Sequence, residues 1–318
     1  MRVLITGISG FAGSHLADYF LAQGRHEIFG TIRWRSNRDN IRHIEDKIHL
    51  VNCDIRDSYA MKSALEATRP DQIFHLAAQS YVPFSWSAPL ETIETNIAGE
   101  LNLFERVREL GINSVIHIAG SSEEYGLVHP DELPITEENP LRPLSPYGVS
   151  KIAQDFLGYQ YYKSYGLRVV RTRAFNHTGP RRGDVFVTSN FAKQLVEIER
   201  GKRKPVLRVG NLEAVRDFLD VRDVVRAYAV VLEKGTPGEV YNIASGKGIK
   251  IKDLLDRLIR LTDGDIKIEQ DPARLRPSDV ELLIGSAEKF RKATGWKPEI
   301  PFDQTLQDLV EYWRNVLK

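Results

Sequence analysis

The sequence contains little from which a disulfide or a metal centre could be built. Cys53 is the only cysteine among the 318 residues, so an intramolecular disulfide and a cysteine-based metal cluster are both excluded. His75, His117 and His177 share no metal-ligand spacing, and we expect them to pack or to form hydrogen bonds. We therefore predict that the protein has no metal site.

Long apolar runs and an excess of charge are also absent. No uninterrupted apolar segment approaches the length that crosses a membrane, and the first residues run into a glycine motif without the features of a signal peptide. The 44 basic and 43 acidic residues leave a net charge of +1, which gives no support for a role on nucleic acids or membrane surfaces. We therefore expect a cytoplasmic protein that binds neither.

The first half of the chain alternates short apolar runs with longer amphipathic segments. This pattern is typical of a parallel sheet with helices on both faces. The predicted strands cover residues 3–6, 27–31, 48–52, 72–76, 114–118 and 167–172. The predicted helices cover residues 12–23, 59–68, 91–110 and 146–165. The sequence therefore predicts an α/β fold with a doubly wound parallel sheet of the Rossmann type.

The strict alternation ends near residue 175. Beyond it we predict strands at 206–209 and 240–243 and helices at 221–233, 251–261 and 305–316. We expect residues 1–175 to form the cofactor-binding domain. Residues 176–318 are predicted to form mainly a smaller substrate-binding lobe, from which one segment can return to the first domain.

A glycine motif follows the first predicted strand and opens the first helix. Gly7, Gly10 and Gly13 have the spacing Gly-x2-Gly-x2-Gly, which allows a tight turn and a close approach of the backbone to a pyrophosphate. The N-terminus of the helix would add oriented N–H donors. A purely turn-forming role is the alternative. The cofactor contacts predicted here are Gly7, Ser9, Gly10, Phe11, Ala12 and Gly13.

The end of the second predicted strand indicates which dinucleotide binds. An NAD-preferring protein usually places an acidic residue here, whereas this sequence has Arg33, Arg35 and Ser36. Two guanidinium groups and a hydroxyl suit a 2′-phosphate, so we predict NADP as the cofactor. A solvated basic loop is the alternative. Further cofactor contacts are expected after the third and fourth strands, at Asp54, Ile55, Leu76, Ala77 and Ala78.

Tyr147 and Lys151 are the predicted centre of the chemistry. Four residues apart in a predicted helix, they share one face. The nearby ammonium is expected to lower the pKa of the phenol, which could then exchange a proton with an alcohol or ketone. Ser121 and Ser122 follow the fifth strand, at the edge where such sheets bind ligands. A serine at this place can hold the reacting oxygen.

Several segments resemble the extended short-chain dehydrogenase/reductase family, within it the GDP-mannose 4,6-dehydratases and the related GDP-4-keto-6-deoxymannose reductases. The similarity covers essentially the whole chain. Its most specific segments are residues 78–82, 85–86, 121–126, 145–147, 175–177, 180–183 and 276–279. The resemblance implies an enzyme that binds a GDP-sugar and assembles as a homodimer or homotetramer.

The resemblance also implies catalytic roles for Ser121, Glu123, Tyr147 and Lys151. Ser121 stands where the dehydratases usually carry Thr, and Glu123 matches their acid/base carboxylate. Tyr147, helped by Lys151, would remove the C4 hydroxyl proton while hydride passes to the nicotinamide. Glu123 would then take the C5 proton and protonate the departing C6 hydroxyl, after which the hydride returns to C6. A capping or surface role is the alternative for Glu123.

The remaining implied site residues bind the two ligands. Phe175 joins the cofactor contacts, together with Tyr147 and Lys151. The implied substrate contacts are Gln79, Ser80, Ser85, Ser122, Asn176, Val187, Lys193, Asn211, Arg216 and Arg276.

Four functions remain open on the sequence. Residues 33–36 and 180–183 and Glu123 favour GDP-mannose 4,6-dehydratase activity, which is our main prediction. Residues 190–194 and 210–217 look more like the 4-keto reductases, which are the alternative. Another sugar-nucleotide dehydratase or a 4-epimerase is less favoured. A non-catalytic NADP-binding regulator is least favoured, because the tyrosine, lysine, serine and glutamate are all present.

Overall fold

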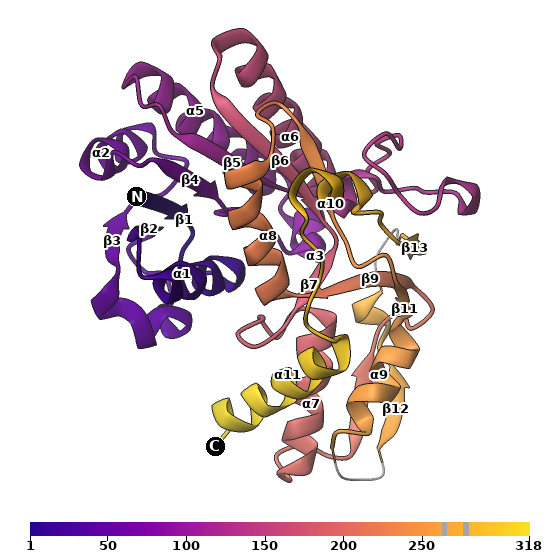
Figure 1. Ribbon diagram of the computed structural model, residues 1–318. Coiled ribbons are helices and arrows are strands. Elements are labelled where there is room, and N and C mark those ends of the chain that lie inside the picture. Colours follow the sequence, from indigo (N-terminus) through magenta and orange to yellow (C-terminus); the bar gives the residue numbers. More distant parts are fainter. Residues whose placement is uncertain (263–265, 276–279) are drawn as a thin grey trace.

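The computed structural model describes residues 1–262, 266–275 and 280–318. Its largest element is a seven-stranded sheet in the order β10-β6-β5-β4-β1-β2-β3, with parallel pairing throughout (Figure 1). The strands are β1 (Arg2–Thr6), β2 (Glu27–Ile32), β3 (His49–Asn52), β4 (Gln72–His75), β5 (Val115–Ser121), β6 (Arg168–Ala174) and β10 (Val240–Ile243). This confirms the predicted fold class.

Alternate residues of the strands face opposite layers of helices, because successive side chains of a strand point to opposite faces. Val3 and Ile5 join a buried cluster that includes residues of α1 and α8. Leu4, between them, joins the cluster on the other face. The helices of the first layer are α1 (Phe11–Gln23), η1 (Asp39–Lys47) and α8 (Val221–Lys234). Those of the second are α2 (Ser58–Thr68), α5 (Gly99–Glu109) and α6 (Pro146–Tyr165).

The strand order reverses beside β1. The chain passes from β1 to β2 and β3 on one side and then crosses to β4 on the other. In open α/β sheets, ligands bind in the crevice that such a reversal opens at the carboxyl ends of the strands. The glycine turn after β1 and the residues after β4 lie on the two sides of this point.

The helix predicted over residues 91–110 has three parts in the structure. It begins as α4 (Pro89–Ile93), passes through a π-helical turn, η2 (Glu94–Ala98), and continues as α5. The extra residue of a π-helical turn shifts the side chains that follow it, and such turns are frequent at functional sites.

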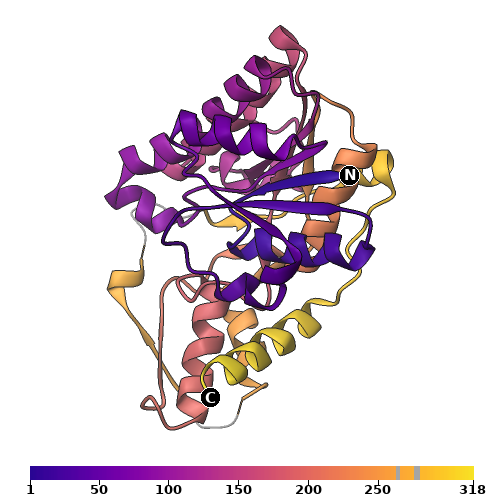
Figure 2. The same ribbon diagram turned by 90° about the vertical axis from the view of Figure 1, so that its left-hand side faces the viewer.

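A second group of elements lies beside the carboxyl edge of the large sheet (Figures 1 and 2). Its helices are α7 (Val187–Glu199), α9 (Ile251–Ile259) and α11 (Phe302–Val316), which share a buried apolar cluster. Its strands are β7 (Asn176–Thr178), β8 (Val206–Val209), β9 (Val215–Asp220), β11 (Gly248–Lys250), β12 (Lys267–Gln270) and β13 (Leu282–Leu283). The remaining short elements are α3 (Val82–Ser87), η3 (Ser122–Glu124), η4 (Pro130–Glu132), η5 (Pro272–Arg274) and α10 (Glu288–Thr294).

Helix α7 was missed by the sequence prediction. Thr188, Ser189 and Asn190 fill its first turn, and such residues prefer caps and turns because their side chains compete for backbone hydrogen bonds. Its buried residues include Phe191 and Leu195, which are four apart and face the same side.

The second half of the chain returns to the large sheet. Strand β10 pairs with β6 at the sheet edge, and α8 packs against α1. The boundary between residues 175 and 176 remains a prediction.

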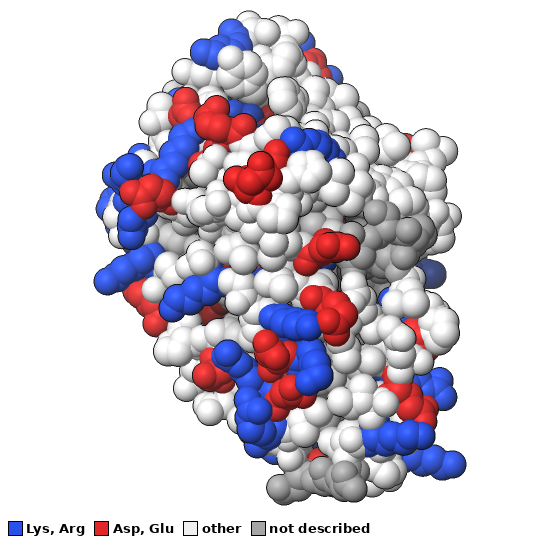
Figure 3. All heavy atoms as spheres, turned by 90° about the vertical axis from the view of Figure 1, so that its right-hand side faces the viewer, with Lys and Arg blue, Asp and Glu red and all other residues white. Residues whose placement is uncertain are grey.

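Charges of both signs are mixed on the surface. On the face shown in Figure 3, basic and acidic side chains are interspersed without a large area of one sign. None of the helices in the described parts of the chain is both long and apolar enough to cross a membrane.

Candidate active site

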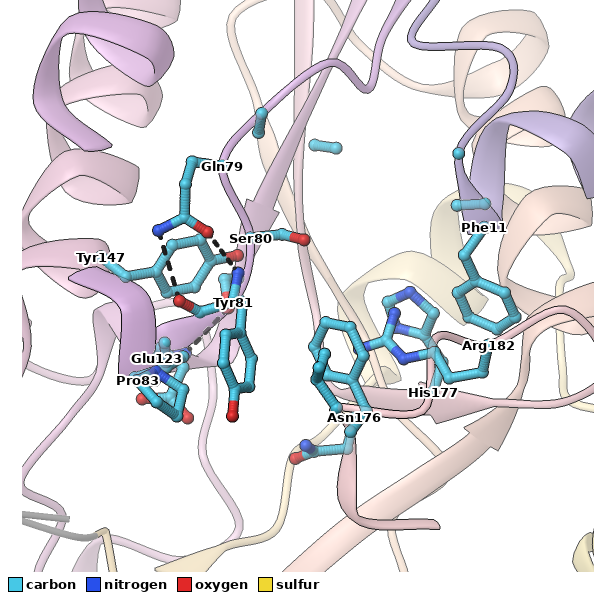
Figure 4. A pocket seen from close by; sticks show the side chains of 18 of the residues that line it. Phe11, Gln79, Ser80, Tyr81, Pro83, Glu123, Tyr147, Asn176, His177 and Arg182 are labelled. Carbon is cyan, nitrogen blue, oxygen red and sulfur yellow. Dashed lines mark hydrogen bonds between the residues drawn. The ribbon is translucent and has the colours of Figure 1, made fainter. Parts of the chain in front are cut away.

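A cavity of about 1220 Å³ opens along the carboxyl edge of the large sheet and extends into the second group of elements. Drug-sized ligands usually occupy pockets of roughly 300 to 1,000 Å³, so this cavity has room for a dinucleotide and a second ligand. Figure 4 shows two facing walls. One carries Ser80, Tyr147 and Glu123, and the other carries Phe11 and Arg182.

The glycine turn fits a pyrophosphate. Gly7 has a φ of +69°, and a Cβ atom there would lie 3.0 Å from the Cα atom of Ala77. A Cβ atom on Gly13 would lie 2.5 Å from the carbonyl oxygen of Gly7. Gly10 caps α1 without a side-chain hydrogen bond, so the first N–H groups of the helix can serve a bound anion.

The adenosine end of the predicted cofactor site holds one of the two expected arginines. Arg33 and Ser36 line the cavity, and the Ser36 hydroxyl accepts a hydrogen bond from the Arg33 backbone N–H at 3.0 Å. Arg35 lies outside the lining, with its guanidinium 4.6 Å from the ring centre of the exposed Trp34. Of these two arginines, Arg33 is therefore the one placed to bind a 2′-phosphate.

The other predicted cofactor contacts also line the cavity. Ile55, Leu76, Ala77, Ala78 and Phe175 all belong to its wall. Asp54 lines it as well, but its carboxylate accepts bonds from the Arg56 guanidinium at 3.1 and 2.7 Å. These bonds hold the pKa of Asp54 below its usual value.

Tyr147 and Lys151 are placed by the start of α6. The Ser145 hydroxyl caps this helix by accepting a bond from the Gly148 N–H at 3.0 Å. Lys151 donates to the Ala119 carbonyl at 2.9 Å, and its ammonium lies 5.9 Å from the centre of the Tyr147 ring. Both side chains are buried.

The expected lowering of the Tyr147 pKa does not occur in this structure. Burial raises the pKa of the phenol, and the Ser121 side chain opposes this rise only in part. Burial also lowers the pKa of the Lys151 ammonium to about 8. Desolvation therefore sets the direction of the shift in the pKa of Tyr147, opposite to the direction that the sequence predicted.

Two adjacent glutamates have separate roles. Glu124 is fully buried, accepts a hydrogen bond from the Ser121 N–H at 2.7 Å and pairs with Arg173 at 3.0 Å. Together with Ser121 it forms the capping box of η3. Glu123 is half-buried at the cavity wall, and no described residue forms a hydrogen bond or ion pair with its carboxylate. The capping role therefore belongs to Glu124, and Glu123 can face a ligand.

Asn96 is a site residue that the sequence analysis missed. From the π-helical turn η2, its side chain binds the Gln79 backbone N–H at 2.8 Å and carbonyl at 3.0 Å, and it donates to the Ser150 hydroxyl at 2.9 Å. It thereby joins the segment after β4 to α6. The Gln79 amide is itself bound to Tyr81, as Figure 4 shows, and to Thr92. This predicted substrate contact is therefore partly used within the protein.

Arg182 is a second residue without a predicted role. Its guanidinium carbon lies 3.4 Å from the ring centre of Phe186 and 4.8 Å from that of Phe11. Burial lowers its pKa to about 10, and the phenols of Tyr147 and Tyr228 oppose this. No carboxylate in the described ranges forms an ion pair with it. The sequence feature that could have indicated Arg182 was the segment 180–183. This segment belonged to the family resemblance but had no assigned role.

Comparison with known proteins decides the family. Residues 4–309 match the family model of GDP-mannose 4,6 dehydratase. The chain belongs to this family. GDP-6-deoxy-D-mannose reductase of Pseudomonas aeruginosa is 35% identical over 99% of this chain and 97% of that protein. GDP-mannose 4,6-dehydratase of Vibrio cholerae is 32% identical over 97% of this chain and 92% of that protein.

Solved structures extend the similarity to three dimensions. RMD from P. aeruginosa, complexed with NADPH, aligns with a TM-score of 0.86 at 33% identity, covering 99% of this chain and 100% of that one. UDP-glucose 4-epimerase of Thermotoga maritima aligns with a TM-score of 0.89 at 29% identity and covers both chains fully. The GDP-mannose 4,6-dehydratase family thus shares its fold with related sugar-nucleotide enzymes.

Most of the predicted substrate contacts lie on the cavity wall of this dehydratase-family protein. They are Gln79, Ser80, Ser122, Asn176, Val187, Asn211 and Arg216. Two lie elsewhere. Ser85 is fully buried and donates to the Val82 carbonyl. Lys193 lies outside the lining and pairs at 2.6 Å with Asp184, which belongs to it. Arg276 lies outside the described residues.

In the described parts of the chain, no cluster of His, Cys, Asp or Glu could hold a metal ion.

Proposed function

We propose that this protein is an NADP-dependent GDP-mannose 4,6-dehydratase, which converts GDP-mannose to GDP-4-keto-6-deoxymannose and water. Glu123 carries this assignment. Its carboxylate stands at the cavity wall without a partner among the described residues, beside Ser121 and close enough to Tyr147 to raise the pKa of the phenol. A carboxylate at such a place can accept one proton and deliver another.

Each catalytic side chain lies where it can carry out one part of the reaction. Bound NADP supplies a hydride acceptor for C4 and, later, a hydride donor for C6. Tyr147 accepts the proton of the C4 hydroxyl as the phenolate, and Ser121 holds the same oxygen. Because burial disfavours the phenolate, this step requires that the bound ligands stabilise it. Glu123 accepts the C5 proton, made acidic by the neighbouring ketone, and protonates the C6 hydroxyl as it leaves as water. Glu123 is ionised again once water has left, and a solvent proton enters at C5 to complete the 6-deoxy sugar. The cycle needs no external reductant, because the hydrogen removed from C4 ends at C6.

Contacts at the two ends of the cavity support NADP and a GDP-sugar as ligands. Arg33 is available to the 2′-phosphate, and the related P. aeruginosa structure contains NADPH. Arg216 and Asn176 line the cavity from β9 and β7 of the second group of elements, where the diphosphate of a nucleotide-sugar would lie. Activity in the cytoplasm is part of the same proposal.

A second copy of the chain is the proposed partner, as a homodimer or homotetramer. Helix α4 packs on α6, and Leu90, Ile93, Val149 and Phe156 of these helices are 65%, 38%, 48% and 56% exposed. A group of large apolar side chains at the surface is typical of an interface. Light scattering of the purified protein tests this, and a monomer at micromolar concentration would contradict it.

The second candidate is the NADPH-dependent 4-reductase of GDP-4-keto-6-deoxymannose. One observation favours it. The alignment with the V. cholerae dehydratase spans 348 positions, more than the 318 residues of this chain, whereas that with the P. aeruginosa reductase spans 314. The dehydratase therefore has insertions that this chain and the reductase lack. A reductase would use Tyr147 to protonate the C4 oxygen and would not need Glu123.

Product analysis separates the two candidates. The purified protein is incubated with GDP-mannose and a catalytic amount of NADP, without reductant. A dehydratase accumulates the 4-keto-6-deoxy sugar. A reductase leaves GDP-mannose unchanged and, in a second reaction, consumes one NADPH for each 4-keto-6-deoxy sugar.

A further inference from the structure

The loop after β7 has an unusual backbone at Arg181. Its φ is +69°, in the left-handed region that side chains rarely adopt. Among the described residues, the other non-glycine residue with positive φ is Arg69, at 40°, the C-cap of α2. Such a conformation persists only where the surrounding contacts hold it.

Three groups of the cofactor-binding region hold the Arg181 side chain. Its guanidinium donates to Asp18 at 2.6 Å, to Nδ1 of His15 at 2.7 Å and to the Asn40 carbonyl at 3.1 Å. Because a guanidinium only donates, Nδ1 of His15 accepts, and Nε2–H donates to the Pro180 carbonyl at 2.8 Å. Burial lowers the pKa of His15 to about 4, so this neutral tautomer is present at neutral pH. We call these contacts the Arg181 clasp.

The clasp is joined to the glycine turn. The Asn40 side chain donates to the Ser9 carbonyl at 3.2 Å, and His15 and Asp18 lie on α1, which the turn opens. The Arg181 side chain is only 14% exposed, against 33% for Asp18. It is therefore better shielded than the surface ion pairs that contribute almost nothing to structure.

Arg181 and Arg182 have different neighbours. Arg181 contacts α1 and η1. Arg182 lines the cavity, where its guanidinium lies near the rings of Phe11 and Phe186, and Figure 4 shows it on the wall opposite Tyr147. No carboxylate in the described ranges pairs with Arg182. The position of the Arg182 guanidinium therefore depends on the rings of Phe11 and Phe186 and on the backbone of its own loop. The Arg181 clasp fixes the backbone of Arg181, the residue directly before Arg182.

We propose that Arg181 is a positioning residue, which holds the Arg182 guanidinium at the cavity wall opposite Tyr147 by means of its clasp on α1 and η1. The inference rests on the proposed function only in taking this cavity as the reaction site. A displacement of about 1 Å near reacting groups can cost about 100-fold in rate. With the clasp removed, the loop is free to move by such a distance.

A double-mutant cycle tests the proposal. Arg181→Gly removes the guanidinium while its backbone still accepts φ of +69°, and Arg182→Gln removes the charge in the cavity. Each is expected to lower kcat/KM about 100-fold. Together they are expected to lower it little further, because Arg181 acts through Arg182. Arg69→Gly is the matched control, since it changes the other left-handed arginine, far from the cavity, and should keep wild-type kcat/KM.

Two results would overturn the proposal: wild-type kcat/KM in Arg181→Gly, or losses that multiply in the double variant. Should Arg181→Gly fail to fold, Asp18→Asn opens the clasp from α1 and enters the same cycle. The cycle is measured in parallel on the Kd of NADPH, because Arg182 contacts Phe11 at the glycine turn. If the wild-type enzyme turns over neither sugar, the proposed function fails, and non-additive losses in NADPH affinity still decide the role of Arg181.

Discussion

Replacing Glu123 by Gln is expected to stop the reaction after its first redox step. Glutamine keeps the size of the side chain but cannot accept the C5 proton. General acid–base catalysis contributes about 100-fold to 10,000-fold in rate, which is about 2.7 to 5.5 kcal/mol of activation free energy. We therefore expect formation of the 6-deoxy product to fall at least 100-fold. Oxidation at C4 should persist, because Tyr147 and Lys151 are unchanged.

A single-turnover experiment reveals this block. Enzyme in excess is mixed with GDP-mannose and NADP, and the absorbance of NADPH is followed while the sugar products are separated by chromatography. The wild-type enzyme should show NADPH only transiently, because the hydride returns to C6. In Glu123→Gln, NADPH should accumulate together with a 4-keto sugar that keeps its C6 hydroxyl.

Glu124→Gln is the matched control, since it makes the same chemical change one residue away. Glu124 is buried against Arg173 and closes the capping box of η3, so its loss should lower the free energy of unfolding by about 1 to 3 kcal/mol and affect the chemistry much less. Urea denaturation measures the first effect, and turnover of the folded protein measures the second. A Glu123→Gln protein whose dehydration rate lies within tenfold of the wild-type rate would contradict the proton-transfer role of Glu123.

Three further substitutions test the cofactor site and the redox step. Tyr147→Phe should lower turnover at least 100-fold while NADPH still binds, and near-native turnover would exclude its proton-transfer role. Arg33→Ala should weaken NADPH binding by about 10- to 100-fold through the loss of a charged hydrogen bond, whereas Arg35→Ala should change it little; fluorescence titration with NADPH and NADH distinguishes them, and equal losses for both dinucleotides would contradict the 2′-phosphate contact. Gly13→Ala places a methyl group 2.5 Å from the Gly7 carbonyl oxygen, so NADPH binding should be lost, and retained binding would show that the turn can shift.

Elements with strong local signals were predicted closely. The helix over 146–165 has a serine cap and a proline in its first turn and ends at Gly166, which adopts a left-handed conformation. Its predicted and observed bounds agree. The strands 206–209 and 240–243 also agree, because each is a short apolar run bounded by turns. The regular alternation of the first half was sufficient to predict six of the seven strands of the large sheet, whereas the seventh, β10, comes from the second half.

Features that depend on tertiary contacts could not be predicted. The π-helical turn at Asn96 is stabilised by bonds to Gln79 and Ser150, distant in the sequence. The roles of Glu123 and Glu124 differ because Arg173 and the Ser121 N–H both contact Glu124. The pKa of Tyr147 follows from its burial, which the spacing of Tyr147 and Lys151 does not reveal.

The fate of the hydrogen at C4 of the sugar tests the proposed dehydratase function most directly. GDP-mannose carrying deuterium at C4 is incubated in ordinary water with the enzyme and a catalytic amount of NADP, and the product is examined by NMR and mass spectrometry. We predict deuterium at C6, a solvent proton at C5 and no net consumption of NADPH. Unchanged GDP-mannose, or a product whose C6 carries no deuterium, would contradict the internal hydride transfer on which the proposed dehydratase function depends.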